Sequence, residues 1–563
     1  MHHHLTLRAK LIIMISVMAS LFLVALDQTI ISTALGKIVE EFHSFDSLSW
    51  IVTAYLITTT ITVPIAGKLS DIFGRRNILL IGVGIFVLGS LFGGMSGNVT
   101  ELIAWRALQG IGGGIITANA FTIVGDLFAA RERGKWQGLI GAVFGLSSVV
   151  GPLLGGWLTD GQGVFGMTTD WRWTFFINVP IGIVAFIMIA VFAPKLLKKV
   201  HKPSIDYMGA GLLAIALATL ILAVDNTETI FAGLIDATGI TLVWLRVIMF
   251  SIVAASIAAF IAVERRAQEP IIPLKFFKNR NFVLIITIAA LFGSAFMGSI
   301  LYLTQFNQQV FGASPTQSGL MLIPMVAGIM VTSIGSGQII SRTGKYKIFM
   351  QIGFVVSTIS MFMLTMLNPE SSYGFEAFVM VLLGLGMGVA MPVLNLAIQN
   401  EVEQHDLGVA TSSSQLFRSL GATIGTAVFG ALLTAGIISN LGTIQDTAYI
   451  KSPAIQAVSA QIGELDNANT LLTLNMPDIK AEITNTVVKT FEQQPQPIAE
   501  AATTQFKEQQ AEYSSKVTHA FSDSLQRIFI VATGLMILST IGVFALKERP
   551  LKASKPGQTP VEM

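Results

Sequence analysis

Asp27 has the clearest capacity for chemistry in this chain, because it lies inside a long apolar stretch, residues 11–35. Apart from Asp27 and Gln28, that stretch holds only apolar and small hydroxyl residues. An ionisable side chain at membrane depth is costly and by default functional. Ser20 lies seven residues before Asp27 and therefore shares its helix face. We interpret this face as the lining of a central cavity with Asp27 as its titratable group; the alternative is an acid hydrated near the membrane surface.

Arg106 is a second ionisable residue in an apolar segment, residues 101–124, and it is followed by Gln109 and a run of glycines. A buried guanidinium needs acceptors or a counter-ion. Carbonyls freed by the glycines, bound water and Asp27 are the candidates. The alternative is an arginine that extends along the helix to the membrane surface. We favour a role in the cavity, because Arg106 falls near the outer end of its segment.

Amide side chains in the second half of the chain could offer further polar contacts to a substrate. The candidates for a substrate cavity are therefore Ser20, Gln109, Gln305, Asn307 and Asn395. The chain has no cysteine, which excludes thiolate metal sites and cysteine nucleophiles. No metal spacing, phosphate-binding glycine loop or nucleophile motif is present. We expect no enzyme activity, no metal and no cofactor, with the proton as coupling ion.

The composition indicates the elements that must position these side chains. The 563 residues are 52% hydrophobic and only 12% charged, with a net charge of +2. Soluble domains carry about 25% charged residues, so this is an integral membrane protein. The small net charge gives no reason to expect nucleic acid as a partner. Hydropathy predicts an all-α protein with fourteen spans, at residues 11–35, 48–67, 78–97, 101–124, 136–159, 173–193, 208–225, 243–263, 282–303, 316–340, 348–367, 374–399, 408–438 and 526–546.

Basic residues alternate with the spans in a way that orients the chain. Arg75, Arg131, Arg265, Arg342 and Lys547 mark successive segments on one side of the membrane. Short loops rich in Lys and Arg stay in the cytoplasm. We therefore predict that both termini are cytoplasmic. Residues His2, His3 and His4 could be a remnant of a tag.

A repeated motif divides the chain into two related halves. Residues 67–76 contain Gly67, Asp71, Gly74, Arg75 and Arg76, and residues 337–345 repeat the spacing of the glycines and the following basic residue, with Ser341 in place of the acid. Related halves are common in transporters. We predict a six-helix bundle at 1–200, two inserted helices at 201–270 and a second bundle at 271–563. The motif forms a tight turn, because its glycines let two helix ends approach closely.

Small residues recur in the fifth span, where they favour close packing of helices. The predicted packing hinge between the two halves consists of Gly141, Gly145, Gly151, Pro152, Gly155 and Gly156.

A long polar segment, residues 440–524, separates the last two spans. Apolar residues spaced four apart within 478–493, and a second helical stretch at 499–520, predict a helical hairpin outside the membrane. The hairpin could be a lid, a surface for a partner in the cell envelope, or a spacer.

These motifs together resemble the major facilitator superfamily, specifically its fourteen-span drug:proton antiporters (QacA-type multidrug exporters). The resemblance rests on residues 26–30, 67–76, 105–110, 151–156 and 171–180. It implies two six-helix bundles plus two extra helices, alternating access, and export of lipophilic and often cationic compounds in exchange for protons. It also implies that Asp27 and Arg106 take part in proton coupling and that Asp71 helps to lock a conformational gate formed by residues 67–76.

The expected function is therefore proton-coupled export of lipophilic or cationic drugs by a functional monomer in the plasma membrane of a bacterium. Export of envelope lipids, assisted by the long outer segment, is the closest alternative. Import of small solutes and a role as a membrane sensor or scaffold are further alternatives.

Overall fold

The computed structural model describes residues 6–42, 48–159, 161, 163–164, 167–193, 205–224, 227–439, 444–453, 455–456, 465, 468–491, 495–549 and 551. The three leading histidines lie outside this part of the chain. So do residues 194–204, which contain the predicted boundary between the first bundle and the inserted helices, and residues 440–443 and 457–464 of the outer segment.

Fourteen helical segments of the described residues are long and apolar enough to cross a membrane, and each predicted span falls on one of them. The helices of the first bundle are α1 (Leu7–Phe42), α2 (Leu48–Phe73), α3 (Arg75–Gly94), α4 (Val99–Leu127), α5 (Ala130–Thr159), α6 (Trp173–Phe176) and α7 (Asn178–Phe192). The next helices are α8 (Tyr207–Val224), α9 (Thr227–Ile230), α10 (Ala232–Thr238) and α11 (Leu242–Glu264).

The second bundle contains α12 (Arg280–Gln309), α13 (Pro315–Met321), α14 (Ile323–Thr343), α15 (Lys347–Leu364), α16 (Tyr373–Gln399) and α17 (Leu407–Ser439). It is completed by α20 (Ala468–Leu474), α21 (Pro477–Phe491) and α22 (Gln496–Ala545). Short 3-10 turns lie at η2 (Leu274–Lys278) and η3 (Gln404–Asp406). A two-stranded antiparallel hairpin, β1 (Gly163–Val164) with β2 (Met167–Thr168), lies between α5 and α6.

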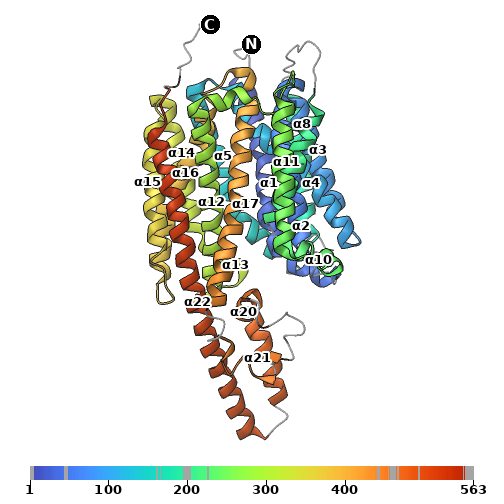
Figure 1. Ribbon diagram of the computed structural model, residues 1–563, viewed down its shortest axis with the longest axis vertical. Helices are drawn as coiled ribbons and strands as arrows, with labels where there is room; N and C mark the ends of the chain where they lie inside the picture. The colour runs from blue at the N-terminus through green and yellow to red at the C-terminus, as the bar shows by residue number, and fades with distance from the viewer. Residues whose placement is uncertain are drawn as a thin grey trace.

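Two bundles share one long seam. In the first, α4 packs against α2 and α3, and α7 packs against α1 and α3; in the second, α12 packs against α17 and α22, and α16 packs against α14 and α15. The seam between them is formed by α5 on α14 and by α2 on α17. The inserted helices α8 and α11 pair with each other, and α8 also packs on α2 and α17 (Figure 1).

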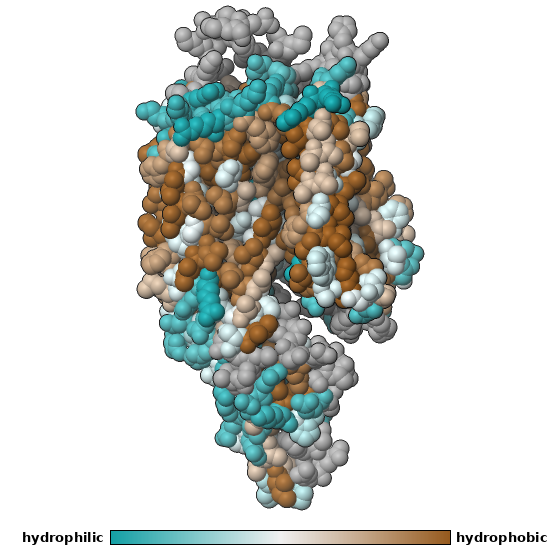
Figure 2. All heavy atoms as spheres, viewed as in Figure 1, coloured by the Kyte–Doolittle hydropathy of each residue, from teal (hydrophilic) through white to brown (hydrophobic). Residues whose placement is uncertain are grey.

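The surface of the bundles has a broad apolar belt between two polar ends (Figure 2). Exposed residues such as Val191, Trp244 and Phe362 contribute to the apolar surface. The beginning of α1 and the end of α22 lie at one end of the bundles, and α20, α21 and the first part of α22 project from the other (Figure 1). We call the end at which α1 begins the basic end, because Arg75 and Arg131 lie in the first turns of α3 and α5 there and Lys345 lies between α14 and α15.

The outer segment forms the predicted helical hairpin, with one difference. Ile483 and Val487 of α21 are buried, as their spacing predicts, and α21 packs against α22. The second arm of the hairpin and the last span are one continuous helix of 50 residues rather than two helices. Residues 521–525, between the predicted helical stretch at 499–520 and the predicted span at 526–546, hold no glycine or proline that would break the helix.

Candidate functional site

Asp27 and Arg106 form an ion pair in the middle of the first bundle. The guanidinium Nη1 of Arg106 donates to Asp27 Oδ2 at 2.5 Å, and both side chains are 1% exposed. The same nitrogen donates to Gln109 Oε1 at 2.8 Å, and Arg106 Nε donates to the carbonyl of Ile51 at 3.3 Å. The guanidinium of Arg106 therefore has hydrogen-bond acceptors on α1, on α2 and on its own helix, α4. The pair has no net charge, which makes its burial tolerable.

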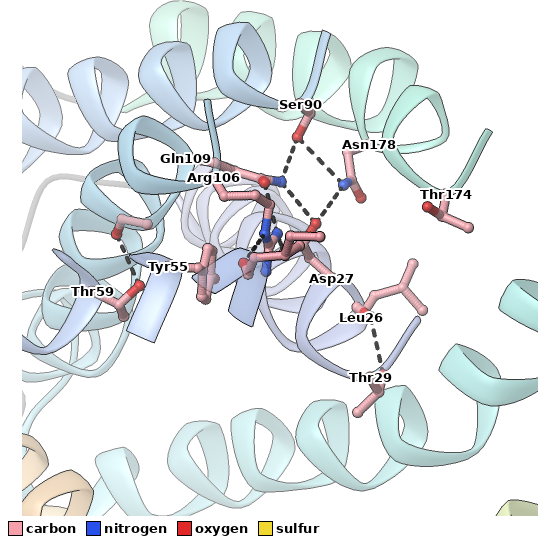
Figure 3. Close-up of polar contacts among 12 residues, drawn as sticks. Leu26, Asp27, Thr29, Tyr55, Thr59, Ser90, Arg106, Gln109, Thr174 and Asn178 are labelled. Carbon is pink, nitrogen blue, oxygen red and sulfur yellow. Dashed lines mark hydrogen bonds and ion pairs between the residues drawn. The ribbon is translucent and has the colours of Figure 1, made fainter. Parts of the chain in front are cut away.

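Three uncharged side chains complete the surroundings of Asp27 (Figure 3). Gln109 Nε2 donates to Asp27 Oδ1 at 2.7 Å and to Ser90 Oγ at 2.8 Å. Asn178, at the start of α7, donates to the same two oxygens at 3.2 and 3.4 Å. The carboxylate thus accepts from Arg106 through one oxygen and from two amides through the other.

An aromatic ring holds the guanidinium from the side. The Arg106 Cζ atom lies 4.3 Å from the ring centre of Tyr55 on α2. The glycine run of α4 makes this possible, because a Cβ atom at Gly110 would lie 2.5 Å from the carbonyl oxygen of Tyr55. Only glycine lets α4 approach α2 so closely. Thr59 uses the same close approach to donate to the Gly110 carbonyl at 3.0 Å.

The surroundings of Asp27 differ from our expectation. We predicted that Asp27 lines a cavity between the two halves, but its partners Arg106, Gln109 and Asn178 all belong to the first bundle and enclose it. An acid and a base that are both desolvated are most stable when they face each other, and this draws them into the bundle. The adjacent Gln28 is exposed.

The remaining cavity candidates lie in separate places. Ser20 is buried and donates to the carbonyl of Ser16 in its own helix at 2.9 Å, so its hydroxyl is already used. Gln305 is half-buried. Asn395 accepts from Gln415 at 3.2 Å, and Gln415 in turn accepts from Arg418. Apart from Gln109, the structure does not bring these residues to Asp27.

Sequence reasoning missed one acidic residue, Glu376, which is the partner of Asn307. With its amide nitrogen toward the carboxylate, Asn307 donates to the two oxygens of Glu376 at 2.9 and 2.8 Å. Both residues are fully buried. Glu376 lies where an apolar run begins, and an acid at such a position normally indicates the boundary of a membrane span. The apolar residues on both sides of it, Phe375 and Ala377, were the available signal.

A second polar cluster closes the seam at the basic end. Arg75 pairs with Asp71, donates to Asp126 Oδ2 at 2.8 Å and donates to Ser70 Oγ at 2.5 Å. Asp71 Oδ2 also accepts from the backbone N–H of Val409, in the first turn of α17, at 3.1 Å. The N-terminus of a helix attracts negative charge. Asp71 therefore joins the first bundle to the second through the N-terminus of α17.

Glycines of the motif allow this contact. A Cβ atom at Gly408 of α17 would lie 2.6 Å from Asp71 Oδ2 and 2.7 Å from the carbonyl of Gly67. Gly74 has a φ of 92°, a left-handed conformation that turns the chain from α2 into α3. Arg76 points away from the seam and donates to the carbonyl of Ala190 on α7 at 2.5 Å. Four of the five gate candidates are thus brought together and Arg76 is not.

The second copy of the motif occupies the equivalent position in the second bundle but has no acidic residue. It lies between α14 and α15 and packs against the start of α5, where Arg131 donates to the carbonyl of Thr343 at 3.2 Å.

The predicted hinge lies on α5, with its small residues on two faces of the helix. Gly141 and Gly145 face α14, and Pro152 lies 3.1 Å from the position of a Cβ atom at Gly319 on α13. Gly151 faces Thr29 of α1, and Gly155 and Gly156 are buried.

The fold has the architecture of a membrane transporter, with two helical bundles that meet along one seam. The sequence matches the profile of the Major Facilitator Superfamily over residues 17–426. The chain belongs to this superfamily. Its members are transporters and not enzymes.

Two bacterial relatives are named as multidrug proteins. The Multidrug transporter protein MdtP of Bacillus subtilis (strain 168) is 35% identical over 545 residues, which cover 95% of this chain and 92% of that protein. Multidrug resistance protein 3 of the same organism is 35% identical over 422 residues, 75% of this chain and 79% of that protein. In fold, the chain is similar to the human organic anion transporter MFSD10 (TETRAN), with a TM-score of 0.56 at 14% identity over 94% of this chain and 99% of that one.

Proposed function

We propose that this protein exports lipophilic, cationic compounds from the cytoplasm in exchange for protons by alternating access. The buried Asp27–Arg106 pair is the observation that carries the proposal, because it is a protonatable group whose net charge changes by one unit when a proton binds. The relatives named as multidrug transporters support the cargo class. The multi-pass fold and the bacterial relatives support a place in the plasma membrane of a bacterium. The basic end is then the cytoplasmic end, by the distribution of lysine and arginine.

Exchange follows from the charge of the pair. With Asp27 ionised, the pair is neutral; with Asp27 protonated, the uncompensated guanidinium of Arg106 leaves a charge of +1. For a cation about 10 Å away, at an effective dielectric constant of about 20, the repulsion is about 1.7 kcal/mol, more than tenfold in affinity. Proton and cationic cargo therefore oppose each other at a distance. Direct contact between cargo and Asp27 is not needed.

Alternating access follows from the seam. The polar contacts between the bundles gather near the basic end, where Asp71 meets α17 and Gln137 donates to Gln399 at 2.9 Å. A bundle pair held together at one end can open at the other. Loss of the Asp71 contact would release the basic end for cargo from the cytoplasm. The proton gradient drives the cycle with about 1.4 kcal/mol per pH unit and the membrane potential with about 2.3 kcal/mol per charge and 100 mV.

The test is a transport assay with purified protein in liposomes. Ethidium and tetraphenylphosphonium are the cargoes, and a pH gradient is imposed in either direction. We expect wild-type protein to move these cations against the proton flow, and Asp27→Asn to lose the response to the gradient. Undiminished, gradient-driven efflux by Asp27→Asn would contradict the proposed coupling.

A matched control is available in Asp170, an acidic residue outside the spans whose side chain is half exposed and pairs with Arg172. Asp170→Asn should transport like wild type. The same liposomes, labelled with a fluorescent lipid in one leaflet, show whether lipid is the cargo.

A further inference from the structure

Glu376 is a second buried carboxyl group, in the second bundle and far along the chain from Asp27. It lies in the first turn of α16, and Asn307 lies in the last turn of α12, both at the end opposite the basic end. Each side chain is 0% exposed. Ser372 and Tyr373, one turn earlier in the chain, are exposed. The carboxyl group is therefore enclosed but lies close to the outer surface.

The partner of Glu376 is an amide and not a cation. Asn307 contacts both carboxylate oxygens, at 2.9 and 2.8 Å. Among the described residues, no lysine, arginine or histidine forms an ion pair with Glu376, in contrast to Asp27 with Arg106. The titratable side chain that faces it is Tyr373 of the same helix, whose hydroxyl donates to the carbonyl of Met321 at 3.1 Å.

The neighbouring elements bring no charge to this place. The helix α13 (residues 315–321), the first turns of α14 (323–328) and the last turns of α15 (360–364) contain no acidic or basic residue. The N-terminus of α16 offers about half an elementary charge, which does not balance a full carboxylate. An ionised carboxyl group buried with one amide is therefore poorly compensated, and a bound proton relieves it.

The amide of Asn307 can serve both protonation states of its partner. Through its nitrogen it donates to an ionised carboxylate, and through its oxygen it accepts from a protonated carboxyl group. Rotation of the amide by half a turn exchanges these roles without moving either helix. A structural salt bridge has no such property.

We propose that Glu376, held by Asn307, is a second proton-binding site of this protein, located in the second bundle and loaded from the outer side. The two bundles then compensate their buried acids in different ways, by Arg106 in the first and by a proton in the second. Proton binding at Glu376 stands without the transport proposal. Its consequence, that a second proton moves in each cycle, rests on the proposed exchange of protons for cations.

The direct test is infrared spectroscopy of the purified protein in lipid nanodiscs during a pH titration. We expect a carbonyl stretching band of a buried, protonated carboxylic acid that Glu376→Gln removes. Asn307→Leu, which deletes the hydrogen-bond partner, should shift that band and not abolish it. The matched control is Glu370→Gln, six residues earlier and exposed, which should leave the band in place. A spectrum of Glu376→Gln identical to that of wild type would overturn the proposal.

Transport gives a second, independent reading. In liposomes with tetraphenylphosphonium, the number of protons exchanged per cation should fall by about one in Glu376→Gln while export continues. An unchanged ratio would remove the role in coupling. If wild-type protein showed the Glu376 band but no exchange, the proposed function would fail and the proton site would stand. If exchange occurred without the band, the proton site alone would fail.

Discussion

The Asp27–Arg106 pair predicts a strong, non-additive effect on stability when its charges are removed. We consider Asp27→Asn, which keeps the shape of the side chain, Arg106→Gln, which shortens it and leaves a neutral amide, and the double variant. Removing one partner of a buried ion pair costs about 3–5 kcal/mol, because the other charge stays buried without its counter-ion. Removing both leaves no buried charge.

The structure places each single variant near the lower limit of that range. After Asp27→Asn, Arg106 keeps Gln109 Oε1, the Ile51 carbonyl and the ring of Tyr55. After Arg106→Gln, Asp27 keeps the amides of Gln109 and Asn178. We therefore expect a loss of about 3 kcal/mol for each single variant. The double variant should lose about 2 kcal/mol, for hydrogen bonds that neutral amides replace imperfectly.

The assay is equilibrium unfolding in detergent micelles, followed by tryptophan fluorescence, for the four proteins of the cycle. Independent sites would give a sum of about 6 kcal/mol for the double variant, so the expected coupling is about 4 kcal/mol. Sites that do not interact add within about 0.5 kcal/mol. If the double variant lost the sum of the two single losses within that margin, the reasoning would be refuted, because the two charges would not compensate each other.

Three further predictions concern other parts of the protein. Asp71→Asn weakens the contact with the N-terminus of α17 by about 1–2 kcal/mol. Because the chain has no cysteine, a single Ser412→Cys, at a buried position that faces Gly67 across the seam, reports on the basic end. Its maleimide labelling should rise about five- to thirtyfold in the Asp71→Asn background, and unchanged labelling would argue against the gate. The hydrogen bond from Arg172 lowers the pKa of Glu41, so the bond stabilises the fold above the ordinary glutamate pKa and its contribution is lost as pH falls through the lowered value. Because the pair is partly exposed, Glu41→Gln should cost at most about 1 kcal/mol at pH 7. The difference from wild type in thermal unfolding should shrink as pH falls below the ordinary glutamate pKa and vanish once Glu41 is protonated in the folded protein. Tyr513→Phe deletes the hydrogen bond from the buried hydroxyl to the Leu471 carbonyl at 2.6 Å and should destabilise the outer hairpin by about 1 kcal/mol. The expected result is faster proteolysis at residues 468–491 with transport intact. Equal proteolysis rates would show that this hydrogen bond does not stabilise the hairpin.

The sequence alone determined the membrane segments and the internal repeat. A span needs about 20 apolar residues in a row, and this requirement is local, so hydropathy finds it without knowledge of the fold. The positions of Asp27 and Arg106 inside such spans, and the turn at residues 67–76, were visible for the same reason. The continuous helix α22 shows the limit of this reading, because a polar stretch and an apolar one need not be separated by a break.

Only the tertiary structure decided which side chains meet. Asp27 faces Arg106 and Asn178 inside the first bundle, Asn307 faces Glu376 inside the second, and Asp71 reaches the start of α17. These pairs join residues between 69 and 338 positions apart, and their contacts depend on how the helices rotate and approach each other. Burial in an apolar environment makes each contact strong, and burial is a property of the packed bundles and not of the linear sequence.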